Sequence, residues 1–120
     1  MNNSMSFLMM IFALGCGVAM AVEYKVGDEA GWTMKADYTQ WAAGKKFHIG
    51  DILVFEYNKE MHDVRRVGKE GFDKCNPEDI RDQYKTGNDK VELETAGPVF
   101  FICGTPGHCE AGQKLSIEVE

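Results

Sequence analysis

Residues 100–113 read FFICGTPGHCEAGQ and carry most of the information about the fold. The apolar run that ends at Cys103 predicts a β-strand whose last residue can point its sulfur into a dry interior. The Pro-Gly pair that follows predicts a turn, which can bring His108 back beside this sulfur. A later glycine predicts a second turn and delivers Gln113 to the same place. The stretch therefore predicts a buried strand followed by a loop that gathers a thiol, an imidazole and an amide.

The sequence after residue 21 predicts a mostly β protein. Gly-, Pro- and Asn-containing turn signals separate short apolar or alternating segments, and we expect short helices only around Tyr38–Ala43 and within Pro77–Tyr84. The expected strands are Tyr24–Val26, Ile52–Tyr57, Val91–Leu93, Val99–Cys103 and Leu115–Val119. Several short strands at this spacing predict a single all-β domain, an antiparallel sandwich or barrel with one or two short helices.

The first 21 residues contain no Asp, Glu, Lys or Arg and end in Ala19-Met20-Ala21 after an apolar run. This pattern predicts a signal peptide over residues 1–21, a mature domain over residues 22–120 and a secreted protein. An uncleaved membrane anchor is the alternative, since the run approaches the length of a bilayer span. The small-x-small end favours cleavage. Because no hydrophobic tail follows, we expect no lipid anchor at the C-terminus and no stable membrane attachment.

The charge balance argues against one class of partner. The chain has 19 acidic and 13 basic residues, a formal net charge of −6, and no large cluster of Lys and Arg. Nucleic acids are bound mainly through contacts of basic side chains with phosphates. We therefore expect no nucleic-acid partner.

The cysteines leave one thiol over. Cys16 departs with the signal peptide, and the mature chain keeps Cys75, Cys103 and Cys109. In an oxidising compartment, an odd number leaves one thiol without an intramolecular partner. If His108 faces a metal from an extended segment, the next residue, Cys109, faces away. Cys109 is then free to pair with Cys75, and Cys103 is the thiolate left for the metal.

A thiolate and an imidazole from one loop, joined by the distant His62, form the His₂Cys set of a blue-copper site. Such sites add a weak axial ligand, often methionine. The last methionine of the chain is Met61, so the loop after Cys103 offers no thioether. We therefore expect the amide oxygen of Gln113 in the axial position. Because an oxygen donor suits Cu(II) better than Cu(I), this ligand predicts a low reduction potential.

Three other interpretations use the same residues. Taken alone, Cys103 could be a buried apolar thiol without a ligand role. Zinc could be bound by His62, Cys103, His108 and Cys109, although this set would leave Cys75 unpaired. A Cys–His nucleophile is disfavoured, because no oxyanion-binding loop and no third orienting residue accompany the pair.

A series of motifs in order covers nearly all of residues 22–120, and in them the chain resembles the phytocyanins, the plant blue-copper proteins. Within this family it is most similar to the stellacyanin and umecyanin subclass. The matching motifs are Tyr24–Asp28 with Gly31-Trp32, Trp41–Lys45, Phe47–Phe55, His62–Val64, Cys75, Gly97-Pro98 and Phe101–Leu115.

The resemblance implies a cupredoxin fold, a Greek-key β-sandwich, and one type 1 copper ion. It also implies a role for each matching residue: His62, Cys103 and His108 as equatorial ligands, Gln113 as the axial ligand, Cys75–Cys109 as a disulfide, and Asp63 as a support of the ligand loop.

The function expected from these observations is one-electron transfer by Cu(I)/Cu(II), not enzymatic catalysis. The electron would leave through His108, which follows the side-chain-free Gly107. We expect a monomer in the extracellular space of plant tissue (the apoplast and cell wall), with a protein or small-molecule redox partner. The alternative is an extracellular structural or signalling module in which copper is incidental, as in relatives that have lost ligands. None of the four ligands is missing here.

Overall fold

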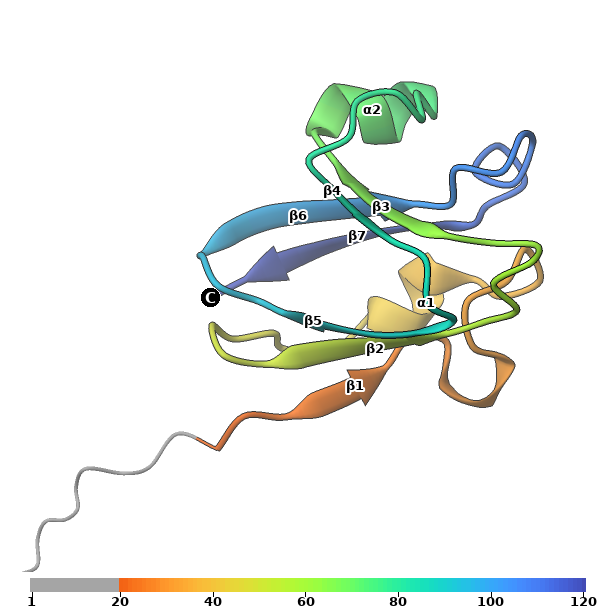
Figure 1. The fold of residues 1–120 in the computed structure, drawn as a ribbon. Coiled ribbons are helices and arrows are strands. Elements are labelled where there is room, and N and C mark those ends of the chain that lie inside the picture. Colours follow the sequence, from red (N-terminus) through yellow and green to blue (C-terminus); the bar gives the residue numbers. More distant parts are fainter. Residues whose placement is uncertain (1–19) are drawn as a thin grey trace, which may run out of the picture.

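The structure, a computed structural model, describes residues 20–120 and forms strands joined by loops and short helices (Figure 1). The strands are β1 (Glu23–Lys25), β2 (Ile52–Glu56), β3 (Val64–Val67), β4 (Asp82–Tyr84), β5 (Asn88–Glu92), β6 (Gly97–Ile102) and β7 (Lys114–Val119). The helices are the 3₁₀ turn η1 (Asp28–Ala30), α1 (Tyr38–Ala42) and α2 (Lys69–Lys74).

The signal peptide expected at residues 1–21 lies, up to residue 19, outside the described residues. From residue 20 onward, no helix is long and apolar enough to cross a membrane.

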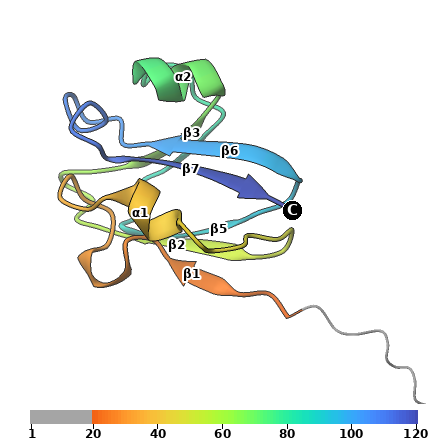
Figure 2. The same ribbon diagram turned by 180° about the vertical axis from the view of Figure 1, so that it is seen from behind.

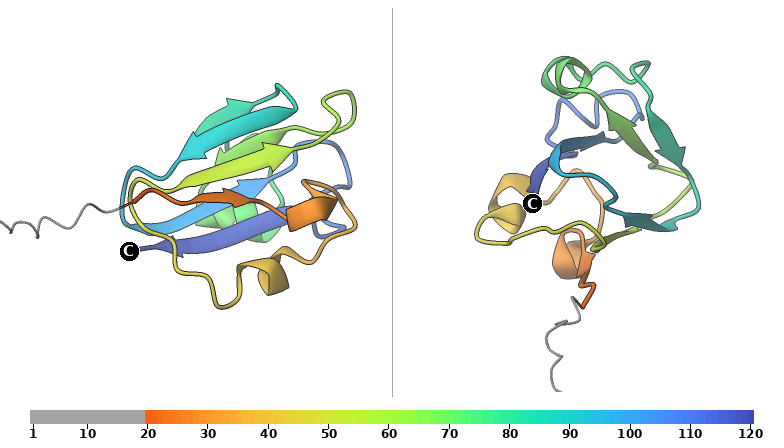
Figure 3. Two further views of the ribbon diagram at one scale, coloured as in Figure 1. Left: turned by 90° about the horizontal axis from the view of Figure 1, so that it is seen from below. Right: turned by 90° about the vertical axis from the view of Figure 1, so that its left-hand side faces the viewer.

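The strands form two facing sheets. One has the order β1-β2-β5 and the other β4-β3-β6-β7. The two layers are seen from opposite sides in Figures 1 and 2, and the view with the left-hand side toward the reader in Figure 3 shows them nearly end on. The predicted sandwich is confirmed. The expectation of antiparallel pairing is wrong for β1 and β2, which run parallel. The chain crosses over through η1 and α1 between these two strands and so enters β2 in the direction of β1.

Aromatic side chains fill the space between the sheets. The ring of Phe55 on β2 packs against Trp32 at 5.1 Å and against Phe101 on β6 at 5.2 Å, measured between ring centroids. Burying each such side chain stabilises the fold by roughly 1.5–3 kcal/mol. Alternation along β6 points Phe101 and then Cys103 into this core, and Cys103 is 1% exposed. Ile102 points the other way, into a smaller cluster with Cys109 on the outer face.

The prediction of a helix within Pro77–Tyr84 is wrong, whereas the helix expected around Tyr38–Ala43 forms as α1. The second helix is α2, which lies earlier in the chain and is supported by the i,i+4 ion pairs Lys69–Asp73 and Glu70–Lys74. Asn76 starts only a tight turn, because its side chain accepts a hydrogen bond from the Glu78 amide. The following residues then pair with β3 as β4, so strand pairing overrides the local helix signal.

Two strands, β3 and β4, were not expected. The sequence of β3 is VRRV, and its two central arginines hide the alternation that marks a strand. β4 has only three residues and depends on β3 for its partner. The strand β3 bears on the site because it directly follows the loop that carries His62.

Tyr38 ties the loop after η1 to the core. Its hydroxyl donates to the carbonyl of Gly31 at 2.6 Å and accepts from the amide of Thr33 at 2.7 Å, and its side chain is 2% exposed. Burial raises the pKa of Tyr38 to about 12. The neutral hydroxyl is therefore the form that the folded state holds.

Tyr38→Phe is expected to lower the free energy of unfolding by about 1–3 kcal/mol near neutral pH, because the buried Gly31 carbonyl and the part-buried Thr33 amide lose their hydrogen-bond partner. In the unfolded chain Tyr38 ionises near pH 10, whereas in the folded chain it ionises near pH 12. The stability that this group contributes is therefore complete below pH 10 and is lost as the pH rises through 12. The difference between wild type and variant should shrink over that interval in urea titrations. The matched control is Tyr24→Phe, because the Tyr24 hydroxyl contacts only the exposed Lys46 carbonyl. An equal effect of both variants would contradict this account.

Candidate metal centre

The chemistry-bearing residues lie at one end of the sandwich, among the loops on the right of Figure 1. The connection between β2 and β3 carries His62. The connection between β6 and β7 begins with Cys103 and carries His108 and Gln113 before β7 starts. The Cys103 amide donates to the Gln113 carbonyl at 3.1 Å, which closes this second connection into a loop. Two loops from different parts of the sequence therefore supply the centre.

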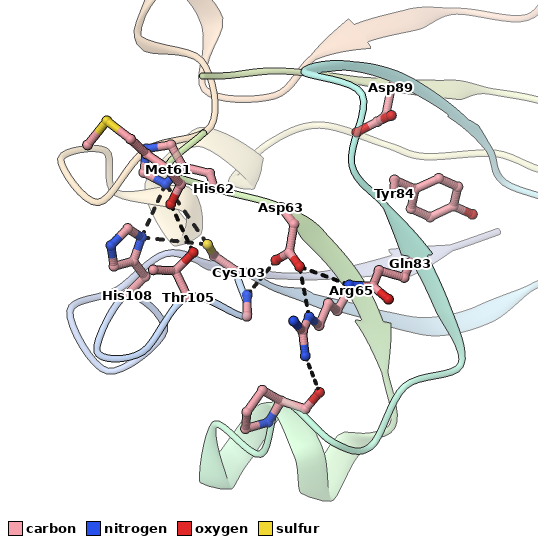
Figure 4. Close-up of polar contacts among 12 residues, drawn as sticks. Met61, His62, Asp63, Arg65, Gln83, Tyr84, Asp89, Cys103, Thr105 and His108 are labelled. Carbon is pink, nitrogen blue, oxygen red and sulfur yellow. Dashed lines mark hydrogen bonds and ion pairs between the residues drawn. The ribbon is translucent and has the colours of Figure 1, made fainter. Parts of the chain in front are cut away.

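The three predicted equatorial ligands converge (Figure 4). The Nδ1 atoms of His62 and His108 are 3.1 Å apart. The sulfur of Cys103 lies 3.9 Å from the His62 Nδ1 and 3.6 Å from the His108 Nδ1. Atoms bound to one small metal ion at about 2.0–2.3 Å lie roughly 3–4 Å from one another. The spacing of these three atoms fits a shared metal ion.

Gln113 adds an oxygen to the group. Its side chain is fully buried, and its Oε1 lies 3.1 Å from the His108 Nδ1. Its Nε2 has no hydrogen-bond partner among residues 20–120. The interior thus holds the amide with its oxygen toward the cluster, although this leaves the nitrogen unpaired. Four atoms therefore face one another: two imidazole nitrogens, a thiol sulfur and an amide oxygen. They carry too few protons to form a hydrogen bond at every one of these contacts. Such a set of lone pairs is the one expected around a cation.

Partial burial favours the metal-binding form of His62. Desolvation lowers the pKa of His62, and charge on His108 lowers it further, while a hydrogen bond with Gln113 and the nearby Asp63 act in the opposite direction. The imidazole is therefore neutral over a wider pH range than a free histidine. A neutral imidazole is the form that binds metals.

The residues on both sides of His62 are tied to the loop that follows Cys103. The Thr105 hydroxyl donates to the Met61 carbonyl at 2.8 Å, and the Gly104 amide donates to Asp63 Oδ1 at 2.7 Å (Figure 4). The Asp63 carboxylate thus contacts the loop that the sequence resemblance expects it to support. These two bonds fix the separation of His62 and Cys103.

The ring of Tyr57 lies beside the ring of His62. The two rings meet edge to face with 6.5 Å between their centroids. The Tyr57 hydroxyl donates to the buried carboxylate of Asp89, and burial together with this bond raises the pKa of Tyr57. Tyr57 thus stays neutral, and its hydrogen bond to Asp89 holds its ring against the imidazole of His62.

The comparisons with known proteins point to one family. The family model described as plastocyanin-like domain matches residues 32–113. Stellacyanin from Toxicodendron vernicifluum is 43% identical over 101 residues, which cover 80% of this chain and 94% of that protein. The chain belongs to the phytocyanins.

Other relatives agree with this assignment. The solved structure of cucumber basic protein, described as a blue copper protein, superposes with a TM-score of 0.75 at 40% identity and covers 82% of this chain and all of that one. Uclacyanin-3 from Arabidopsis thaliana is 37% identical over 119 residues, and this phytocyanin spans 53% of its length. The fold is cupredoxin-like, and the His–Cys–His group fits a single type 1 copper ion.

The disulfide of this phytocyanin joins Cys75 and Cys109, as the sequence predicts. The extended segment expected around His108 and Cys109 does not form. They lie in a helical turn, in which the Ala111 amide donates to the Gly107 carbonyl and the Gln113 amide to the His108 carbonyl. Successive residues in such a turn point about 100° apart, which is enough to direct His108 inward and Cys109 toward Cys75.

The other interpretations of the cysteines do not fit the phytocyanin structure. The four-ligand zinc site needs Cys109 as a thiolate, and Cys109 is in the disulfide. A nucleophile must be reached by its substrate, and Cys103 is 1% exposed. Cys103 is the free cysteine among residues 20–120, and it lies against two imidazoles, so it is more than an apolar core residue.

Two residues near the centre of the phytocyanin were not predicted, Arg65 and Gln83. Both donate to Asp63 Oδ2, at 2.9 Å and 3.1 Å respectively. Arg65 could not have been found by strand alternation, because the sequence does not predict β3 and Asp63 precedes that strand. Gln83 could not have been found, since its position depends on the unexpected pairing of β4 with β3.

Proposed function

We propose that this phytocyanin carries single electrons through one copper ion, with His62, Cys103 and His108 as its ligands. The observation that carries the proposal is the convergence of two imidazole nitrogens and a buried thiol at distances that suit one ion. When bound there, copper would supply a one-electron Cu(I)/Cu(II) couple. Loops tied to each other on both sides of His62 would keep the ligands in place in both oxidation states.

His108 is the proposed exit for the electron. It is partly exposed, and its neighbours Pro106 and Gly107 are exposed, so the edge of its ring lies near the surface. Electron transfer through a ligand edge needs close approach of a partner and no substrate cavity. We therefore propose a carrier and not an enzyme.

A test of this proposal is redox cycling of the copper-loaded protein. A chemical reductant should bleach the visible band and an oxidant should restore it, with one electron taken up per copper ion on reduction and one released on oxidation. A colourless protein, or a band that does not respond to reductant, would favour the structural or signalling module.

Gln113 is the proposed axial ligand, and we infer a low reduction potential from it. Its oxygen faces the cluster from a fully buried side chain. Gln113→Met should raise the reduction potential, because a thioether favours Cu(I) over Cu(II) relative to an amide oxygen. The measurement is voltammetry of the copper-loaded variant. Gln40→Met, at an exposed position of α1, is the matched control and should leave the potential unchanged. An unchanged potential in Gln113→Met would remove Gln113 from the coordination sphere.

The remaining parts of the proposal concern setting and partner. We propose that residues 1–21 are a cleaved signal peptide and that residues 22–120 act as a monomer in the extracellular space of plant tissue. The redox partner, a protein or a small molecule, would approach at the His108 end. Beside His62, Met61, which is 54% exposed, lines a surface depression together with the exposed Lys59, Glu60 and Lys85. This mixed lining offers an apolar contact through Met61 and does not favour one sign of charge in the partner.

A further inference from the structure

The carboxylate of Asp63 is enclosed by three donors from three segments of the chain. Its Oδ1 accepts from the Gly104 amide at 2.7 Å, and its Oδ2 accepts from Arg65 Nε at 2.9 Å and from Gln83 Nε2 at 3.1 Å. The residue is 9% exposed. A carboxylate in such a place is costly unless an opposite charge lies against it. Arg65 supplies that charge, and Gly104 and Gln83 do not.

The Arg65 guanidinium lies directly on the backbone of the ligand loop. A Cβ placed on Gly104 would lie 2.1 Å from Arg65 Nε and 2.2 Å from its Cζ, so the guanidinium occupies the space that any side chain at residue 104 would need. The Arg65 side chain is 19% exposed. Arg65 therefore covers the peptide that follows Cys103 and limits its movement.

The far end of Arg65 reaches a different segment. Its NH1 donates to the Pro77 carbonyl at 2.8 Å (Figure 4). Pro77 lies two residues after Cys75, whose disulfide partner is Cys109 in the ligand loop. One side chain thus connects the Cys103 end of the loop with the segment that anchors its Cys109 end. A lysine could not replace it, because its ammonium group is a compact point charge. The planar guanidinium, in contrast, reaches Asp63 through Nε and Pro77 through NH1 at the same time.

We propose that Arg65 is a positioning residue that holds the Gly104 peptide in place and neutralises Asp63, and that it thereby raises the reduction potential of the centre. The inference rests on the proposed copper function and adds to it a determinant of the potential. Without Arg65, the negative charge of Asp63 would stand uncompensated beside the ligands. Negative charge in a medium of low polarity favours the more positive metal state, Cu(II), and so lowers the potential.

The neighbouring Arg66 provides a matched control. It lies on the same strand, and its Nε and NH2 both donate to Asp82 Oδ2, at 3.0 Å and 2.8 Å. Its side chain is 39% exposed, so solvent and salt screen its charge. Arg66→Met removes the same formal charge as Arg65→Met, but it does not touch Asp63, Gly104 or the ligand loop.

The test compares Arg65→Met, Arg65→Lys and Arg66→Met by voltammetry of the copper-loaded proteins. It also measures hydrogen exchange of the Gly104 amide in each protein before copper is added. Arg65→Met should lower the potential more than Arg66→Met and should speed Gly104 exchange roughly tenfold. Arg65→Lys, which retains the charge, should give an intermediate potential and remains informative if Arg65→Met does not fold.

Equal potentials in Arg65→Met and Arg66→Met would overturn the inference, and so would unchanged Gly104 exchange in Arg65→Met. Failure of the wild-type protein to take up copper would refute the proposed function instead. The Gly104 exchange measurement, which needs no copper, keeps the two failures apart.

Discussion

Cys103→Ser is expected to abolish the intense visible band of the copper-loaded protein. That band requires a thiolate bound to Cu(II), and Cys103 is the one free cysteine among residues 20–120. The serine hydroxyl is a harder and far less acidic donor, so copper affinity should also fall by orders of magnitude. Absorption spectroscopy during titration with Cu(II) measures both effects.

Two further variants make this result interpretable. Cys103→Ala avoids placing a hydroxyl in an apolar core and should be equally colourless. His48→Gln removes an imidazole that lies near Asp51 and Glu120, outside the cluster, and should stay fully coloured. A blue band that survives in Cys103→Ser would mean that the ligand has been misassigned.

Removing the Cys75–Cys109 disulfide is expected to have the largest effect on stability. The bond closes a loop with a sequence separation of 34 residues. The chain-entropy relation for a loop of this length gives a stabilisation of about 4 kcal/mol. The double variant Cys75→Ala with Cys109→Ala should therefore lose about that much free energy of unfolding in urea titrations made before copper is added.

The double variant should also weaken copper binding, because Cys109 directly follows His108. Without the bond, the turn that directs His108 inward loses its anchor beneath α2. The control is Lys69→Ala with Asp73→Ala, which breaks an exposed ion pair on α2 and should cost less than about 1 kcal/mol. A loss in the disulfide variant no greater than in this control would contradict the structural role assigned to the bond.

The ligand loop could be predicted from the sequence because its information is local. Between Phe100 and Gln113 the chain contains, in order, a strand, a turn, a histidine, a second turn and a glutamine. The odd number of cysteines in the mature chain then indicates Cys103 as the free thiol. His62 lies 41 residues before Cys103, and no periodicity connects the two. Its assignment came with the blue-copper set and the resemblance to the phytocyanins.

What the sequence could not supply depends on strand pairing. The arginines in β3 hide that strand, and the short β4 has no signal apart from β3, so a helix was expected within Pro77–Tyr84, where β4 forms. Since β3 and β4 carry Arg65 and Gln83, the enclosure of Asp63 was also out of reach. The direction of Cys109 was predicted correctly from an extended geometry that the loop does not have.

The most direct test of the proposed centre is a titration of the purified wild-type protein with Cu(II), followed by visible absorption and metal analysis. We expect an intense blue band that saturates at one copper per chain and disappears on reduction. A protein that stays colourless with one equivalent of copper, or that retains stoichiometric zinc in its place, would contradict it.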